Sequence, residues 1–286
     1  MTFVAKQGLT ATELSEIEAL MALCNAYEKL DLKLNLGTLR MRPQKETSDF
    51  LYYEDGHLVG FLPIFSFNPG EAEISGMVHP DYRRRGIFTT LFKAAQAECQ
   101  RRKVKTLLLI VGHTSRSGQA FVQTLRVHYH HSEYKMELAE VKPLLSVNEH
   151  LSFREAKLDE VQILTHITAV SFDLPEEGVD WYSEKALRQP TRRYYVALLG
   201  DTYIGKVDVI FDEQSAYIAG VGVLPVYRGR GYGRQILGRT IREILATGQR
   251  HIVLEVATNN KNALSLYHSC GFRETGSDDY YSLQEM

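Results

Sequence analysis

The sequence has few cysteines, almost no net charge and no long apolar run, and each shortage excludes a class of protein. Its three cysteines, Cys24, Cys99 and Cys270, lie far apart without a CxxC pair, which argues against a disulfide framework and a zinc site. The formal net charge of -2 argues against a protein that coats nucleic acid or an anionic membrane. No apolar run approaches the ~20 residues of a membrane span, and the N-terminal residues lack a signal peptide's apolar core. We therefore expect a cytoplasmic protein.

The most informative stretch runs from Ala216 to Gly233. Small and β-branched residues predict a strand that stops at Pro225, and a basic turn rich in glycine follows. The residues after Gly233 carry apolar side chains at helical spacing, which predicts an amphipathic helix. A strand that leads through a glycine turn into a helix forms an anion site, because free backbone N–H groups and the helix dipole converge there.

Other interpretations of this glycine-rich turn are weaker. A flexible loop or an arginine-glycine tail that binds nucleic acid would lie in disordered sequence, not between a strand and a helix. The turn is not a P-loop, because no Lys-Ser/Thr pair follows Gly233, and it lacks the dinucleotide fingerprint. The pattern therefore favours phosphate binding over a purely structural turn.

The sequence indicates an internal duplication. Four features recur at an offset of 145 positions (205 − 60, for example): Gly60 and Gly205, Pro80 and Pro225, Tyr82-Arg83 and Tyr227-Arg228, Gly86 and Gly231. Each half also holds a predicted hairpin, at 50–62 and at 194–207. We predict an α/β (α+β) fold of two domains, 1–142 and 151–286, joined by a linker at 143–150 and each built on a mixed central β-sheet flanked by helices.

Two motifs in the second half resemble those of one enzyme superfamily. Arg228-Gly229-Arg230-Gly231-Tyr232-Gly233 resembles the pyrophosphate loop of the GNAT superfamily, the acyl-CoA-dependent N-acyltransferases, and the stretch Asn260 to Phe272 resembles its second motif. The resemblance implies two tandem GNAT-like domains, each with a splayed sheet that holds CoA between two parallel strands. It also implies acetyl-CoA as co-substrate, bound by Val221, Gly222, Val223, Arg228, Gly229, Arg230, Gly231, Tyr232, Gly233, Arg234 and Asn260.

The same resemblance implies a catalytic pair. Ribosomal-protein alanine acetyltransferases of this superfamily have a Leu-Glu-Val strand with a basic Glu and a Tyr that acts as acid. Glu255 and Tyr267 stand at the same separation here (267 − 255 = 12). Glu255 would then accept the proton of the attacking ammonium, and Tyr267 would protonate the CoA thiolate. Alternatively, Glu255 pairs with a neighbouring cation, Tyr267 is a packed core aromatic and Asn260 is a helix N-cap.

The first half departs from the superfamily's pattern at these points. Phe88 stands where the second half has Gly233. With Ala120 aligned on Ala263, the second half's Tyr267, Glu255 and Asn260 correspond to Thr124, Gly112 and Ser117. We therefore expect a degenerate domain with structural, substrate-shaping or second-CoA-binding duties, as in tandem relatives such as the mycothiol synthases.

The expected function is an N-acetyltransferase in which a primary amine of a small molecule or peptide attacks acetyl-CoA directly in a ternary complex. The alternative is a non-catalytic acyl-CoA-binding sensor or interaction module. We expect no metal, because His128, His130 and His131 have no further ligand at helical spacing, no nucleic-acid or membrane partner, and a monomer or homodimer. Acidic residues that border the acceptor cleft in the superfamily indicate a cationic acceptor, although surface solvation explains them equally well: Asp173, Glu176, Glu177, Asp208, Asp278 and Asp279.

Overall fold

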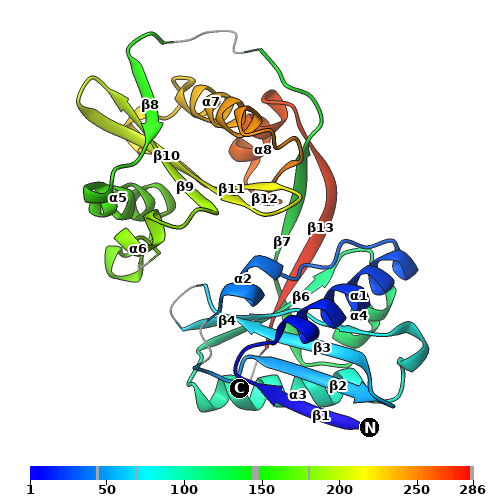
Figure 1. The fold of residues 1–286 in the computed structure, drawn as a ribbon. Coiled ribbons are helices and arrows are strands. Elements are labelled where there is room, and N and C mark those ends of the chain that lie inside the picture. The colour runs from blue at the N-terminus through cyan, green and yellow to red at the C-terminus, as the bar shows by residue number, and fades with distance from the viewer. Residues whose placement is uncertain (43–44, 68–69, 144–147, 180, 284–286) are drawn as a thin grey trace. The chain divides into compact units, whose positions relative to one another are not determined.

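The structure, a computed structural model, describes residues 1–286 except 43–44, 68–69, 144–147, 180 and 284–286 (Figure 1). The chain forms two compact units. Unit 1 comprises Met1–Glu133 together with the described residues from Gly276 onward, and unit 2 comprises Tyr134–Thr275. Within the described residues, no helix is both long and apolar enough to cross a membrane.

Unit 1 is a mixed sheet between helices. Its strand order is β1-β2-β3-β4-β6-β13-β7, with β5 paired to β3. β4 and β6 run parallel, whereas β1, β2, β3 and β4 pair antiparallel in succession. The elements of unit 1 are β1 (Thr2–Lys6), α1 (Ala11–Glu28), α2 (Leu36–Met41), β2 (Asp49–Glu54), β3 (His57–Phe65), β4 (Glu71–Ile74), β5 (Met77–Val78), a 3-10 turn (Pro80–Tyr82), α3 (Ile87–Arg101), β6 (Thr106–Gly112), α4 (Arg116–Val122) and parts of β7 (Val127–Leu138) and β13 (Phe272–Leu283).

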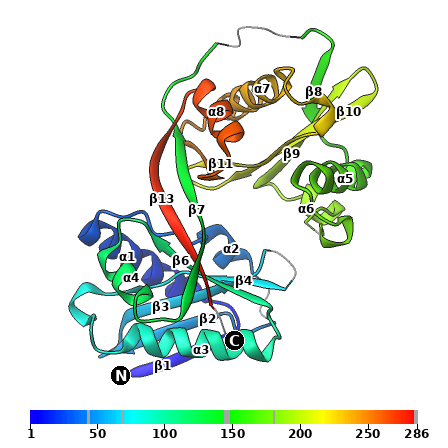
Figure 2. The ribbon, with the colours of Figure 1, turned by 180° about the vertical axis from the view of Figure 1, so that it is seen from behind.

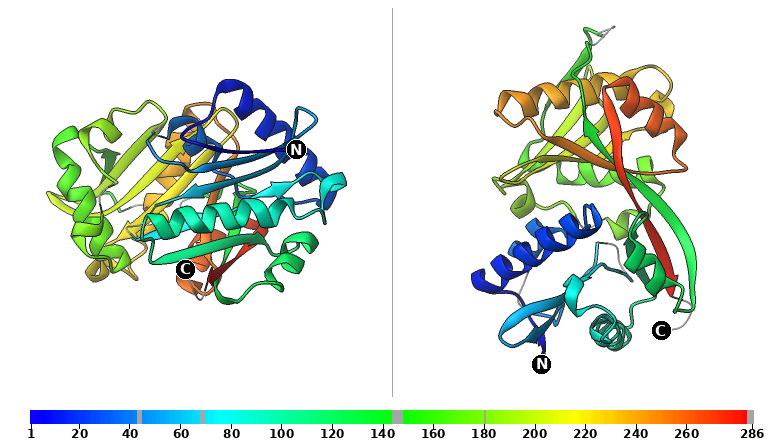
Figure 3. Two further views of the ribbon diagram at one scale, coloured as in Figure 1. Left: turned by 90° about the horizontal axis from the view of Figure 1, so that it is seen from below. Right: turned by 90° about the vertical axis from the view of Figure 1, so that its right-hand side faces the viewer.

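The strands of unit 1 bury both faces because α1 and α3 lie on opposite sides of the sheet (Figure 3). Leu51 and Phe61 pack toward α1, and their neighbours Phe50 and Leu62 pack toward α3. Side chains alternate along a strand, so a strand that is apolar at every position has to be covered twice. Helix α1 begins at a capping box formed by Thr10 and Glu13.

Unit 2 repeats this architecture (Figures 1 and 2). Its strand order is β8-β9-β10-β11-β12-β7-β13, and β11 and β12 form the parallel pair. Helices α5 and α6 cover one face, while α7 and α8 cover the other. The elements of unit 2 are β8 (Leu151–Glu155), 3-10 turns (Leu158–Glu160, Glu176–Gly178, Pro225–Tyr227), α5 (Val161–Phe172), α6 (Glu184–Leu187), β9 (Arg192–Leu199), β10 (Thr202–Phe211), β11 (Ala216–Val223), α7 (Tyr232–Ala246), β12 (Ile252–Ala257) and α8 (Lys261–Ser269). The predicted architecture of two mixed sheets flanked by helices is confirmed.

Two strands belong to both units. β7 begins in unit 1 and ends in unit 2, and β13 does the reverse. The second part of β13 pairs antiparallel with β6, from Asp278 opposite Gly112 to Ser282 opposite Leu108. The units therefore differ from the predicted contiguous segments 1–142 and 151–286, since each sheet includes a strand from the other half of the sequence. The predicted linker 143–150 connects β7 to β8, and its residues 144–147 lie outside the described ones.

Candidate functional site

The turn from Arg228 to Gly233 has the backbone of an anion site. Gly229 and Gly231 have φ of 74° and 80°, the left-handed region that glycine adopts without strain. A Cβ atom at either glycine would meet no atom within 4 Å, so the space beside the backbone is open. Helix α7 begins directly after Gly231, and within the described residues no side chain caps its first turn. Its N-terminal N–H groups can therefore serve an anionic ligand.

The arginines of this turn have different roles. Arg228 donates from Nε to the Val223 carbonyl oxygen over 2.9 Å and from Nη2 to the Ser171 carbonyl oxygen over 2.8 Å. It thus ties the turn to the end of β11 and to α5. The guanidinium of Arg230 lies 6.0 Å from the ring centroid of Tyr227. Arg230 and Arg234 are exposed and can bring positive charge to the turn.

Unit 1 builds the same turn from a different sequence. Arg84 takes the left-handed position of Gly229, with φ of 65°, and Gly86 has φ of 80°. Arg83 donates from Nε to the Val78 carbonyl oxygen over 3.1 Å, the counterpart of the bond from Arg228. Arg85 lies 4.8 Å from the ring centroid of Tyr82. Phe88 at the Gly233 position therefore leaves the backbone of the turn intact.

Above the turn, the parallel strands of unit 2 diverge. The paired residues of β11 and β12 run from Ala216 opposite Ile252 to Ile218 opposite Leu254, although β11 continues to Val223. The predicted backbone contacts of Val221 and Val223 thus lie on a stretch beyond the paired part of β11. Gly222 faces α5, where a Cβ atom would lie 3.0 Å from Ser171 Oγ. A larger residue would push α5 away from this strand.

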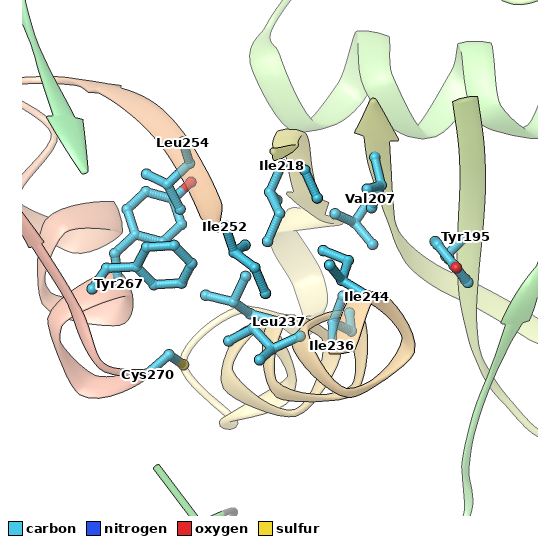
Figure 4. Packing of buried hydrophobic residues seen from close by; sticks show 14 of the residues in the cluster. Tyr195, Val207, Ile218, Ile236, Leu237, Ile244, Ile252, Leu254, Tyr267 and Cys270 are labelled. Carbon is cyan, nitrogen blue, oxygen red and sulfur yellow. The ribbon is translucent and has the colours of Figure 1, made fainter. Parts of the chain in front are cut away.

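Glu255 and Tyr267 lie on opposite faces of the sheet of unit 2. On β12, Leu254 is buried in the core that α7 and α8 cover, so its neighbour Glu255 points to the other face. There the Tyr217 hydroxyl donates to Glu255 Oε2 over 3.1 Å. Tyr267 lies on α8 inside the core, in one cluster with Leu254 and Cys270 (Figure 4).

Tyr267 is both a core aromatic and a chemically suitable acid. Its residue is 8% exposed, and its ring lies 6.1 Å from that of Phe272. Burial, with a smaller contribution from Cys270, raises the pKa of Tyr267 to about 12. The phenol is therefore protonated at neutral pH, as a proton donor has to be. The third predicted residue of this region, Asn260, caps α8: its Oδ1 accepts from the Ala263 N–H over 3.1 Å.

The structure corrects the alignment expected for unit 1. Ser115, and not Ser117, caps α4 as Asn260 caps α8, since Ser115 Oγ accepts from the Gly118 N–H over 3.1 Å. The 145-residue offset then holds through this helix, and Tyr267 corresponds to Val122 instead of Thr124. On β6, Ile110 faces away from α3 as Glu255 faces away from α7. Ile110, and not Gly112, is therefore the counterpart of Glu255. Both replacements are buried and apolar. Neither can transfer a proton.

Unit 1 nevertheless holds a cavity of about 370 Å³ between its turn and the ends of its parallel strands. The turn contributes Arg84 and Gly86, β5 contributes Val78, and α4 contributes Gly118. Cys24 and other residues near the end of α1 close the remaining side. The half expected to be degenerate thus retains a cavity beside a turn whose backbone matches that of unit 2.

The acidic residues expected to border an acceptor cleft are divided between the two units. Asp278 and Asp279 lie on the part of β13 that belongs to unit 1. Asp279 accepts there from Ser132 Oγ over 2.6 Å and from Gln119 Nε2 over 3.0 Å. A sequence motif cannot show that the last strand crosses into the other unit.

Sequence reasoning missed a buried ionic cluster on the α5 face of unit 2. Lys206 is fully buried and forms an ion pair with Asp208 over 2.6 Å. The Tyr182 hydroxyl donates to the same carboxylate over 2.9 Å. The polar residues at alternate positions of an otherwise apolar strand were the available signal. Among the described residues no group of His, Cys, Asp and Glu is arranged to hold a metal ion.

Known proteins resemble the chain over both halves. It is 25% identical to mycothiol acetyltransferase of Mycolicibacterium smegmatis, over 97% of each chain. It is 35% identical to N-alpha-acetyltransferase RimI of Mycobacterium tuberculosis, over 32% of this chain and 59% of the relative. A GCN5-related N-acetyltransferase from Sphaerobacter thermophilus shares the fold with a TM-score of 0.81 at 16% identity, over 98% of this chain and 95% of that one. A tandem GNAT protein from the clavulanic acid biosynthesis pathway has a TM-score of 0.74 at 19% identity, over 98% and 97%.

The acetyltransferase (GNAT) family itself matches twice, over residues 14–125 and 160–272, which correspond to the two repeats. The resemblance stated from the sequence motifs is thereby confirmed for both halves. Members of this family use acetyl-CoA as co-substrate. The chain belongs to the acetyltransferase (GNAT) family as a tandem, acyl-CoA-dependent acetyltransferase.

Proposed function

We propose that unit 2 transfers an acetyl group from acetyl-CoA to a primary amine of a small molecule or a peptide, by direct attack in a ternary complex. The observation that carries this proposal is the position of Glu255 and Tyr267 on opposite faces of the sheet, where β11 and β12 diverge. With a base on the acceptor side and an acid on the thioester side, one group can take the ammonium's proton while the other protonates the thiolate.

The reaction proceeds in three coupled events. Glu255 takes a proton from the acceptor's ammonium, directly or through water, because only the neutral amine is a nucleophile. The amine then attacks the thioester carbonyl, whose oxygen is stabilised by backbone groups of β11 at Val221 and Val223. As the C–S bond breaks, Tyr267 gives its proton to the departing thiolate, and the acylated nitrogen loses its second proton to the Tyr267 phenolate, which gives the neutral amide and restores the phenol.

The cofactor's phosphates would bind at the glycine turn. The N–H groups of the first turn of α7 and the open space at Gly229 and Gly231 supply the anion site. Arg230 and Arg234 add positive charge, and Arg228 acts by fixing the shape of the turn. Asn260 caps α8, so its contribution to CoA binding would come from its amide NH₂ group.

The test is amine-dependent release of CoA thiol, measured over a panel of small amines and of peptides with free α-amino groups. Peptides belong in the panel because one relative is an N-alpha-acetyltransferase. A ternary complex predicts intersecting initial-rate lines and no acetylated enzyme by mass spectrometry. Binding of acetyl-CoA without amine-dependent thiol release for any acceptor would favour the alternative, a non-catalytic acyl-CoA-binding sensor or interaction module.

A second proposal concerns unit 1, which we infer binds acyl-CoA without catalysing transfer. Its cavity of about 370 Å³ adjoins an intact turn, whereas Ile110 and Val122 occupy the positions of the acid–base pair. Calorimetry with acetyl-CoA should give two equivalents per chain. Binding of a single equivalent of acetyl-CoA, lost entirely in a Gly231→Glu variant, would contradict the proposal.

A further inference from the structure

One strand irregularity distinguishes the two units. In unit 2, β10 and β11 pair as Lys206 opposite Gly222 and Asp208 opposite Ala219. An advance of three residues along β11 therefore matches an advance of two residues along β10. This is a β-bulge, and its residue Gly220 has φ of +54°. The corresponding strands of unit 1 pair as Phe61 opposite Met77 and Ile64 opposite Ile74, with three steps on each side. The described pairing of unit 1 therefore carries no bulge.

The two β10 residues that flank the bulge form a buried ion pair. Lys206 Nζ lies 2.6 Å from Asp208 Oδ2, and the side chain of Lys206 is 1% exposed. Both groups also bond the Tyr182 hydroxyl, which lies 2.9 Å from Thr168 Oγ1 on α5. The positions 145 residues earlier hold Phe61 and Pro63, which carry no charge. The bulge and the ion pair thus occur together in unit 2, and the same segment of unit 1 has neither.

The ammonium contacts the bulge directly. A Cβ atom on Gly220 would lie 2.5 Å from Lys206 Nζ and 3.1 Å from Asp208 Oδ2. Burial of a lysine is costly, and it lowers the pKa of Lys206 against the opposing effect of Asp208. Because an apolar residue fills the same position in unit 1, the fold alone does not require this charge. Its close fit against Gly220 indicates a role for the charge at the bulge.

We propose that the Lys206–Asp208 ion pair is a positioning device that holds the β11 bulge, and with it the backbone groups of Val221 and Val223, in the shape that acetyl transfer requires. The inference rests on the proposed assignment of catalysis to unit 2. A bulge leaves one residue out of the ladder, so its backbone groups are free to turn toward the gap between β11 and β12. Lys206 and Asp208 are positioning residues because they act through β11.

The decisive variant is Lys206→Met, an unbranched side chain that ends about where Cε of lysine lies and therefore removes the ammonium group with its charge. We expect amide hydrogen exchange of the peptide spanning Gly220–Val223 to accelerate at least 10-fold, and kcat to fall 10- to 100-fold. The control is Arg154→Met, which breaks an ion pair of unit 2 between the half-buried Arg154 on β8 and the buried Glu160, away from β11. That variant should lose thermal stability without either effect.

A double-mutant cycle tests the contact itself. Gly220→Ala alone should lower kcat strongly, because alanine is strained at positive φ and meets the ammonium. In the double variant Gly220→Ala with Lys206→Met, the fold decrease in kcat should be smaller than the product of the two single decreases, because the alanine Cβ no longer meets the ammonium. Multiplicative losses would overturn the proposed contact. If Lys206→Met does not fold, Lys206→Met with Asp208→Leu removes both charges together and serves in its place.

Unchanged exchange at Gly220–Val223 in a folded Lys206 variant would overturn the proposal, and so would faster exchange with wild-type kcat. Failure of the proposed function would look different. In that case the wild-type protein would show no amine-dependent thiol release, while hydrogen exchange and calorimetric binding of acetyl-CoA would still report whether Lys206 holds the bulge.

Discussion

Individual side chains in unit 2 have structural roles beside the chemical roles proposed for them. Tyr267 packs in the core with Leu254, yet its raised pKa suits a proton donor. Asn260 fulfils its alternative interpretation, an N-cap, at a position where the family contacts CoA. Arg228 binds backbone carbonyls and shapes the turn. The motif residues Asn260 and Arg228 therefore hold local structure, whatever contact they make with a ligand.

Replacing Tyr267 by phenylalanine keeps the packed ring and removes only the hydroxyl. We expect kcat to fall on the order of 10²–10⁴-fold, with the KM for acetyl-CoA nearly unchanged, because a lost acid affects only the transition state. Steady-state kinetics under conditions where chemistry limits the rate would measure this. Tyr195→Phe removes a hydroxyl from the same core cluster on β9 and should leave kcat unchanged. A Tyr267→Phe enzyme with wild-type kcat would remove Tyr267 from the mechanism.

Replacing Glu255 by glutamine removes the proposed base and keeps the shape of the side chain. Activity should fall most at neutral pH, on the order of 10²-fold or more, and recover partly as pH rises because the amine then deprotonates without help. The pH dependence of kcat/KM measures this, with Glu155→Gln on the exposed part of β8 as a control. An unchanged pH profile would assign the base role to ordered water or to the acceptor's surroundings.

At the scale of elements, the turn and the start of the helix that follows it recur in both units. Each turn has two left-handed residues, an arginine bonded to the end of the preceding strand and a helix that starts without a side-chain cap at its described N-terminus. The units differ in the strands beside the turn, where β11 has a bulge and the described strands of unit 1 pair without one. In the functions proposed above, the turn binds the cofactor and the neighbouring strand makes the difference in catalysis.

The glycines of the two turns offer a matched pair of substitutions. Gly231→Glu places a carboxylate in the open anion site of unit 2, which adds repulsion and strains a positive φ. We expect loss of turnover and of one equivalent of acetyl-CoA in calorimetry. Gly86→Glu should remove the other equivalent with much less effect on turnover. If Gly86→Glu is the more damaging change for turnover, the catalytic unit has been assigned the wrong way round.

The start of α5 provides a pH-dependent stability test. A hydrogen bond from Arg154, against the opposing effect of burial, lowers the pKa of Glu160 to about 2 from its usual 4.5. A lowered carboxyl pKa stabilises the fold fully above pH 4.5 and loses that contribution as pH falls toward 2. Glu160→Gln should therefore cost about 2–3 kcal/mol at pH 7 and much less near pH 3. Thermal unfolding at both pH values would measure it, and an equal cost at both would contradict the assigned pKa.

At the scale of the whole molecule, the two repeats are not independent segments. The second part of β13 lies between β6 and β7 in the sheet of unit 1, and the second part of β7 lies beside β12 in unit 2. Each sheet would lose an interior strand without the other half of the sequence. Unpaired backbone groups on an exposed strand edge are costly and prone to association.

Separating the halves tests this dependence. We expect fragment 1–142, which lacks β13, and fragment 151–286, which lacks β7, to be unfolded or aggregated alone and to regain structure when mixed or co-expressed. Circular dichroism and gel filtration would follow this. The control is a chain cleaved between 143 and 150 after folding, which should remain one particle. Two cooperatively folded, monomeric fragments would contradict the strand exchange.

The sequence alone specified the local features of this protein. Glycine and arginine spacing predicted both turns, apolar strand segments on either side of a short polar turn predicted the hairpins at 50–62 and 194–207, and the repeat predicted two mixed sheets. These features depend on backbone preferences over a few residues, which the sequence states directly. The family motifs then directed attention to Glu255 and Tyr267.

Only the tertiary structure decided which strand completes which sheet, where Asp278 and Asp279 lie, and that Lys206 meets Gly220 beside the bulge. The physical reason is that backbone hydrogen bonds are the same for any pair of strands. The pattern of apolar residues therefore shows which face of a strand is buried, but it does not determine which other strand it pairs with. Likewise the sequence shows a lysine and an aspartate in an apolar strand, but only the packing around them shows that Lys206 and Asp208 form a buried ion pair.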